Sequence, residues 1–164
     1  MKKISLIIQV LNEEKNVAQL YQEIKAVMAE LTYSFEIIFI DDGSIDGTLA
    51  ALKKLSPLTV ISFTRNFGKS QALQAGFNEA SGDYIITLDG DLQDDPVEIP
   101  NFIQSLEKGL DLVCGWKYKR KDNFGRRFIS KIANLITKSF TKTTVHDMNC
   151  CFKGYQKKIG RAHV

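Results

Sequence analysis

The sequence predicts an α/β fold in which a mostly parallel central sheet is flanked by helices. Two observations carry this prediction. Apolar runs of strand length alternate with amphipathic segments of helical length, and each apolar run ends abruptly in polar residues. Alternation at this spacing implies right-handed crossovers between parallel strands. Ligands of such sheets lie beyond the carboxyl ends of the strands, so the polar residues that follow the runs are expected to form one site.

The composition indicates one globular domain and excludes several classes of function. The chain has 164 residues, of which 44% are hydrophobic and 25% charged, enough to bury a core. A net charge of +3 gives no support to nucleic-acid binding. The three cysteines form neither a Cys-x-x-Cys pair nor a disulfide framework, which indicates reduced thiols in a cytoplasmic setting. No apolar run approaches the roughly 20 residues that span a bilayer.

The first half of the chain predicts two strand–helix units. A mostly apolar run from Lys3 to Val10 predicts a buried strand. Asn12 then has the side chain to cap a helix over about 13–31, whose apolar residues recur on one face. Residues 35–40 predict a second strand, and a short leucine-bearing helix is expected to begin at Asp46 or Thr48.

The following elements repeat the pattern. We expect a strand over 59–63, a helix over 69–80 and a central strand over 84–88. A helix over about 97–108 and one more strand over 111–115 complete the alternation.

The segment after residue 116 is strongly basic and predicts an amphipathic helix over about 125–141. Its apolar residues recur at helical spacing: Phe128, Ile129, Ile132, Leu135, Ile136 and Phe140. Such a helix can lie in a membrane interface. It can equally pack on the core with a solvated basic face, and the sequence leaves both interpretations open.

The residues at the end of the predicted central strand form a candidate metal site. Asp89 and Asp91 are two positions apart, which places both carboxylates on one side of the chain. Carboxylate oxygens held this close suit Mg²⁺ or Mn²⁺, which would keep open positions for a diphosphate. An acidic turn after an edge strand is the alternative. No glycine-rich phosphate loop follows the first strand, so a bound diphosphate would need a metal to neutralise it.

Four short motifs stand in order along the chain: Leu11-Asn12-Glu13-Glu14, Asp41-Asp42-Gly43-Ser44-x-Asp46-Gly47-Thr48, Arg65-Asn66-Phe67-Gly68 and Asp89-Gly90-Asp91-Leu92-Gln93-Asp94-x-Pro96. This order resembles the family 2 glycosyltransferases of the GT-A fold. The runs that begin at Arg65 and Asp91 are similar, more narrowly, to the polyprenyl-phosphate (dolichol-phosphate-type) sugar transferases. The resemblance covers about residues 3–157.

The resemblance implies a role for particular side chains. Residues implied in nucleotide binding are Glu13, Asp42, Arg65 and Asp89. Residues implied in metal binding are Asp89, Asp91 and Gln93. Residues implied in catalysis are Asp89, Asp91 and Asp147, the last of which lies near the acceptor in the family. Residues implied in binding the acceptor phosphate are Lys117, Arg126, Arg127 and Ser130.

The activity implied by the resemblance is that of an inverting hexosyltransferase. It would move a sugar from a UDP- or GDP-sugar to a polyprenyl phosphate, for cell-envelope or glycan assembly. A phosphate acceptor is already ionised at neutral pH, so direct displacement requires little general-base help. The enzyme would work peripherally on the cytoplasmic face of the membrane, with the full-length form anchored there.

Two positions depart from the family pattern. Gln9 stands where the family commonly has proline, which changes the shape of a loop. Lys117 stands where the family commonly has arginine. Lysine keeps the charge but loses the bidentate fork on phosphate, which weakens the expectation of tight acceptor binding.

The sequence leaves other functions open. The chain could be a non-catalytic or truncated nucleotide-binding fragment, a membrane-surface module, or a family 2 transferase with a saccharide acceptor. A sugar-1-phosphate nucleotidyltransferase would need a glycine-rich, arginine-containing loop where Leu11 to Glu14 stand.

The domain organisation follows the same resemblance. We expect residues 1–158 to be a GT-A catalytic domain whose C-terminal part is missing. Residues 159–164 have the sequence that a common sequencing adapter encodes, so we expect them to be a non-native tail.

Overall fold

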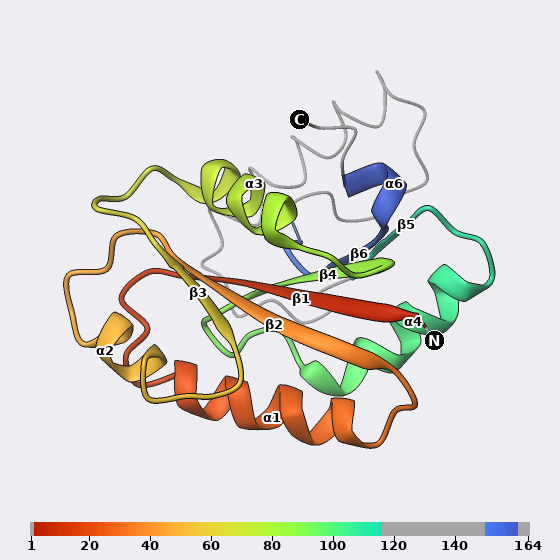
Figure 1. Cartoon of the computed structure of the whole chain (residues 1–164), viewed down its shortest axis with the longest axis horizontal. Helices are drawn as coiled ribbons and strands as arrows, with labels where there is room; N and C mark the ends of the chain where they lie inside the picture. Colours follow the sequence, from red (N-terminus) through yellow and green to blue (C-terminus); the bar gives the residue numbers. More distant parts are fainter. Residues whose placement is uncertain (1, 116–149, 161–164) are drawn as a thin grey trace, which may run out of the picture. The chain divides into compact units, whose positions relative to one another are not determined.

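The computed structural model of the chain describes residues 2–115 and 150–160 (Figure 1). Six strands form one sheet: β1 (Lys3–Val10), β2 (Ser34–Asp41), β3 (Thr59–Ser62), β4 (Tyr84–Asp89), β5 (Leu112–Cys114) and β6 (Lys153–Gln156). Their order across the sheet is β3-β2-β1-β4-β6-β5. The pairs β1–β2, β1–β4 and β2–β3 are parallel, and β4–β6 is antiparallel. The predicted α/β fold with a mostly parallel sheet is confirmed.

The helices follow the predicted alternation, with shorter bounds. They are α1 (Val17–Ala29), α2 (Thr48–Leu52), α3 (Lys69–Glu79), the 3-10 turn η1 (Pro96–Glu98), α4 (Ile99–Glu107) and α6 (Lys157–Gly160). Figure 1 shows α3 on one face of the sheet and α1 on the other.

Strand β1 is the centre of the hydrophobic core. Ile4, Leu6, Ile7 and Ile8 are fully buried because helices cover both faces of the strand. This double burial explains why most residues of the strand are apolar, since a strand with one face in water would alternate apolar and polar residues. The helix α3 lies close to the sheet at Gly76, where an added Cβ would stand 2.5 Å from Cγ2 of Ile7.

Helix α1 begins at Val17, four residues later than expected, and the predicted N-cap at Asn12 is wrong. Asn12 has a left-handed backbone (φ 57°), and its side-chain oxygen accepts a hydrogen bond from the N–H of Ile45 at 2.9 Å. Its own N–H donates to the hydroxyl of Ser44 at 2.9 Å. Asn12 therefore joins two loops instead of starting the helix.

The antiparallel strand β6 is absent from the sequence-based prediction. It pairs with β4 so that Tyr84 lies opposite Gln156 and Thr87 opposite Lys153. Phe152, just before β6, stacks on Phe102 of α4 with ring centroids 4.3 Å apart. Only four residues long and partly exposed, β6 has no apolar run that predicts it.

The chain divides into two compact units, one formed by residues 1–113 with 152–164 and the other by residues 114–151. The candidate functional site belongs to the first unit. The predicted basic helix over 125–141 and residues 161–164 of the predicted tail lie outside the described residues. Within the described residues, none of the helices is long and apolar enough to cross a membrane.

Candidate functional site at the carboxyl edge of the sheet

An open pocket of about 180 Å³, here called the edge pocket, lies at the carboxyl ends of β1 and β4. Its lining comes from the ends of these two strands and from the first residue of α3: Gln9, Val10, Leu11, Glu13, Lys69, Asp89, Gly90 and Asp91. Three of the carboxylates that the sequence selected, those of Glu13, Asp89 and Asp91, therefore meet at one place. The pocket lies where an open parallel sheet is expected to bind its ligand.

The turn after β4 is built to hold Asp89 and Asp91 against β1. The N–H of Gly90 donates to the carbonyl of Gln9 at 3.0 Å, and an added Cβ on Gly90 would stand 2.4 Å from Val10. Only glycine permits this approach. Buried Asp94 then accepts the N–H of Asp89 at 3.0 Å, which folds the loop back on the strand.

Lys69 is a functional candidate that the sequence-based reasoning missed. Its Nζ lies 2.7 Å and 3.0 Å from the two carboxylate oxygens of Asp89. The lysine is the first residue of α3 and stands 20 positions before Asp89 in the chain. Nothing in the local sequence predicts the pairing, because it arises only when α3 packs on β1 and β2 and its first residue reaches the end of β4.

The residues at the edge pocket fit a divalent metal held jointly with a diphosphate. Among residues 2–115 and 150–160, no group of three or more His, Cys, Asp and Glu side chains could hold a metal ion. Mg²⁺ is nevertheless usually bound through one or two carboxylates, with substrate phosphates and water completing the octahedron. Asp89 and Asp91 supply such a pair, and the ammonium of Lys69 already lies against Asp89 as a cation.

The electrostatics of the pocket favour a cation. Partial burial raises the pKa of Glu13, and the nearby charges of Asp91, Asp46 and Asp89 raise it further. A hydrogen bond from Asn16 to Glu13 at 2.6 Å opposes the shift. The smaller part of the pKa shift that comes from these carboxylates reflects their mutual repulsion, which a bound cation would relieve.

Asp42, which the family resemblance assigns to the nucleoside, is 1% exposed and anchors a loop. Its two carboxylate oxygens accept hydrogen bonds from the N–H groups of Phe67 at 2.8 Å and Gly68 at 3.0 Å. These contacts hold the segment that leads directly into Lys69. The contact of Asp42 with a base remains a prediction.

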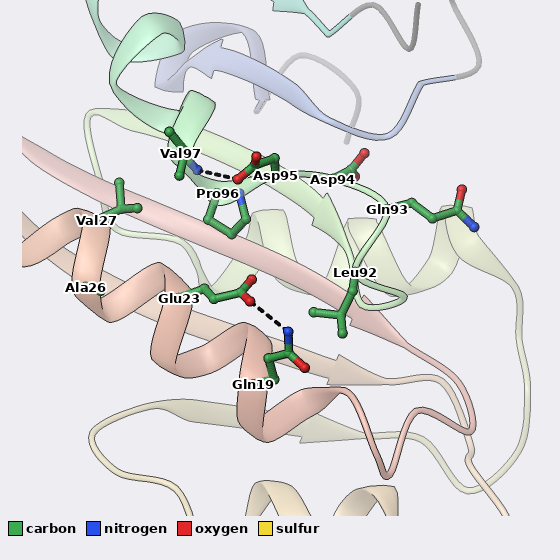
Figure 2. A pocket seen from close by; sticks show the side chains of 10 residues that line it. All are labelled: Gln19, Glu23, Ala26, Val27, Leu92, Gln93, Asp94, Asp95, Pro96 and Val97. Carbon is green, nitrogen blue, oxygen red and sulfur yellow. Dashed lines mark hydrogen bonds between the residues drawn. The ribbon is translucent and has the colours of Figure 1, made fainter. Parts of the chain in front are cut away.

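Two other predicted residues are not brought to the edge pocket. Arg65 is exposed, with its guanidinium carbon 4.8 Å from the ring centroid of Phe67. Gln93 lines a second hollow of about 500 Å³ between α1 and the loop after β4. Figure 2 shows this hollow with Gln19 and Glu23 of α1 on one side and Leu92 on the other. Gln93 approaches Asp91 through its backbone N–H, 3.1 Å from Oδ1. The predicted metal contact of the Gln93 side chain gains no support.

The first two sequence motifs serve mainly to fasten two loops together. The N–H of Glu13 donates to the hydroxyl of Thr48 at 2.8 Å, and the N–H of Gly47 donates to the carboxylate of Glu14 at 3.2 Å. With the two bonds of Asn12, these contacts fix the loop after β1 to the loop after β2. These contacts position Glu13 at the edge pocket.

The residues predicted to bind the acceptor phosphate, and the predicted catalytic Asp147, are not located relative to the edge pocket. Five residues that the resemblance selected lie outside the described residues: Lys117, Arg126, Arg127, Ser130 and Asp147. Their roles at the acceptor phosphate and in catalysis stay predictions.

Comparison with named proteins gives a consistent set of relatives. The chain is 38% identical, over 96% of its length, to the dodecaprenyl-phosphate galacturonate synthase of Rhizobium johnstonii, and it covers 48% of that protein. It is 37% identical, over 97% of its length, to the undecaprenyl-phosphate 4-deoxy-4-formamido-L-arabinose transferase of Serratia proteamaculans, of which it covers 50%. The chain thus spans about half the length of these curated relatives.

The structure resembles that of glucosyl-3-phosphoglycerate synthase from Mycobacterium tuberculosis, solved with Mn²⁺, UDP-glucose and phosphoglyceric acid. The TM-score is 0.78 at 20% identity, over 96% of this chain and 58% of that one. At this identity the likeness concerns the fold alone, and it confirms the GT-A expectation. Residues 5–162 match the family described as Glycosyl transferase family 2. The chain belongs to glycosyl transferase family 2.

Proposed function

We propose that the chain is the donor-binding and catalytic part of an inverting glycosyltransferase that moves a sugar from a nucleotide-sugar to a polyprenyl phosphate. The observation that carries this proposal is the edge pocket, where Glu13, Asp89 and Asp91 meet beside one lysine. A site with this crowding of negative charge favours a metal-bound diphosphate over a neutral ligand.

The charged residues of the edge pocket have different parts in donor binding. Asp89 and Asp91 would hold Mg²⁺ or Mn²⁺ on the diphosphate, and Glu13 would contact the nucleoside. When bound, the metal stabilises the charge of the departing nucleoside diphosphate. Lys69 lies within reach of the same phosphates, because its ammonium already contacts Asp89. The buried contacts of Asp42 keep the segment before Lys69 in place.

The acceptor half of the proposal is supported by the relatives. The names of the two relatives, a dodecaprenyl-phosphate galacturonate synthase and an undecaprenyl-phosphate 4-deoxy-4-formamido-L-arabinose transferase, both contain a polyprenyl phosphate. An ionised phosphate of this kind attacks without a strong general base, so positioning in line with the leaving group suffices, and direct displacement inverts the anomeric centre. Because one relative is named for an arabinose derivative, the transferred sugar need not be a hexose. We place the reaction at the membrane surface, where such an acceptor resides.

Calorimetry on the 164-residue chain with UDP and GDP, each with and without Mg²⁺, tests the donor half. We expect one of the two to bind, and to bind more tightly with Mg²⁺. Turnover is then measured with the matching nucleotide-sugars and a short polyprenyl phosphate. Metal-dependent binding without turnover would favour a nucleotide-binding fragment, and transfer to a free saccharide would favour the saccharide-acceptor alternative. No binding of either nucleotide contradicts the proposal.

A further inference from the structure

Gln9 lines the edge pocket and carries a polar atom that residues 2–115 and 150–160 leave without a hydrogen-bond partner. This atom, the side-chain Oε1, is buried. Its neighbours along the strand, Ile8 and Val10, are apolar and buried. A buried acceptor without a donor costs free energy, so such an atom in a pocket calls for an explanation.

The register of the sheet locates Gln9 between the two parts of the proposed donor site. Gln9 lies opposite Ile40 on β2 and opposite Asp89 on β4. Strand β2 leads into Asp42, which the resemblance assigns to the nucleoside, and β4 leads into Asp89 and Asp91, assigned to the metal and diphosphate. A ligand bridging these strand ends must cross the end of β1. In a nucleoside diphosphate, the group that joins the base to the diphosphate is the ribose.

We propose that the side-chain amide of Gln9 forms a hydrogen bond with a ribose hydroxyl of the bound nucleoside diphosphate. An amide oxygen accepts from a hydroxyl and an amide nitrogen donates to one, so either orientation of the amide serves. The inference rests on the proposed function. It adds a contact particular to this chain, since the family commonly has proline at this position and proline has no polar side chain to offer.

The proposal predicts opposite effects on binding and on stability for Gln9→Met. Methionine has a similar length but no amide, so it removes the unsatisfied oxygen together with the contact to the ligand. Binding of UDP or GDP with Mg²⁺ should weaken about 3- to 10-fold, the usual net worth of one hydrogen bond. Without ligand, the variant should melt at the same temperature as the natural chain or higher. A merely structural glutamine would show the reverse pattern.

Deoxynucleotides show which hydroxyl of the nucleotide contacts Gln9. Calorimetry compares the ribonucleoside diphosphate with its 2′-deoxy and 3′-deoxy forms, on the natural chain and on Gln9→Met. The natural chain should lose about 3- to 10-fold in affinity for one deoxy form, whereas the variant should lose little further. Gln22→Met is the matched control, because Gln22 is an exposed glutamine of α1 remote from the pocket lining. Gln9→Leu serves as a second apolar variant if the methionine protein does not fold.

The outcomes separate this inference from the proposed function. If neither UDP nor GDP binds the natural chain, the proposed function fails and the inference fails with it. If the nucleotide binds the natural chain and both apolar variants equally well, the role of Gln9 alone is wrong. The same conclusion follows if the variants discriminate against the deoxy forms as strongly as the natural chain, or if they melt at a lower temperature.

Discussion

The carboxylates at the two ends of the central sheet have opposite environments. At the amino end, the carboxylate of Glu36 accepts hydrogen bonds from Lys3 at 2.6 Å, from the hydroxyl of Ser5 and from the N–H of Ser81 at 2.7 Å. Partial burial alone would raise the pKa of Glu36, but these donors outweigh it and lower the pKa to about 2. The protein itself satisfies this charge.

At the carboxyl end, Glu13, Asp89 and Asp91 face an open pocket and share the neighbourhood of Lys69. Burial and the surrounding carboxylates raise the pKa of Glu13, the opposite direction to Glu36. The contrast shows how one sheet can carry both stability and function. A carboxylate that accepts hydrogen bonds from the protein stabilises the fold. Carboxylates that lie close together beside an open pocket are available to a ligand.

Asp91→Asn should weaken ligand binding at the carboxyl end of the sheet without unfolding the protein, and we expect it to have the largest effect. Removing a proposed metal ligand should weaken Mg²⁺-dependent binding of UDP or GDP by about 100-fold or more, since changes even one shell further out typically cost about 10–100-fold. Calorimetry with and without Mg²⁺ measures this, and thermal melts check the fold.

Asp111→Asn is the matched control for charge, because Asp111 pairs with Lys158 away from the edge pocket. If Asp91→Asn binds nucleotide as the natural chain does, and Mg²⁺ still strengthens that binding, the metal assignment is incorrect.

Lys69→Met should change the binding of metal and nucleotide in opposite directions. Without the ammonium against Asp89, Mg²⁺ alone should bind about 2- to 5-fold more tightly, the worth of a partly exposed ion pair. Nucleoside diphosphate with Mg²⁺ should bind about 10-fold more weakly, because a charge-assisted contact to phosphate is lost. Titrations of the metal alone and of the nucleotide at saturating metal separate the two effects.

Lys53→Met provides the same substitution at an exposed residue just after α2. Equal changes in metal and nucleotide affinity for Lys69→Met would contradict the prediction that Lys69 contacts the phosphates of the bound nucleotide.

Glu36→Gln should affect stability alone and have the smallest effect, about 1 kcal/mol at neutral pH. The pKa of Glu36 is lowered from 4.5 to about 2 in the folded state, so the unfolded state binds a proton that the folded state refuses. The stabilisation is complete above pH 4.5 and is lost as the pH falls from 4.5 toward 2. Urea unfolding at several pH values should show this loss in the natural chain and a flatter profile in the variant.

Glu79→Gln, at an exposed position of α3, should keep the natural pH profile. A Glu36→Gln profile parallel to that of the natural chain would show that this end of the sheet does not stabilise the fold through Glu36.

Local sequence determined a large part of the fold and of the site. The mostly apolar runs predicted β1 to β4 to within one residue at every end. Strands β1, β2 and β4 are largely buried, and a strand buried on both faces is mostly apolar. Parallel pairing then placed the polar residues after these strands at one edge. This is why the sequence pattern alone could bring Glu13, Asp89 and Asp91 together.

Tertiary structure decided the rest, because the missing contacts join residues that are distant in the chain. The pairing of β6 with β4, the loop contact between Asn12 and Ile45, and the ion pair of Lys69 with Asp89 each depend on how separate elements pack. The place of Gln9 beside Asp89 depends on strand register, which local pattern does not specify across a parallel crossover. The sequence alone therefore brought Glu13, Asp89 and Asp91 to the carboxyl edge, because these residues follow parallel strands. Packing and register added Lys69 and Gln9 to them and decided which of these side chains have partners within the protein.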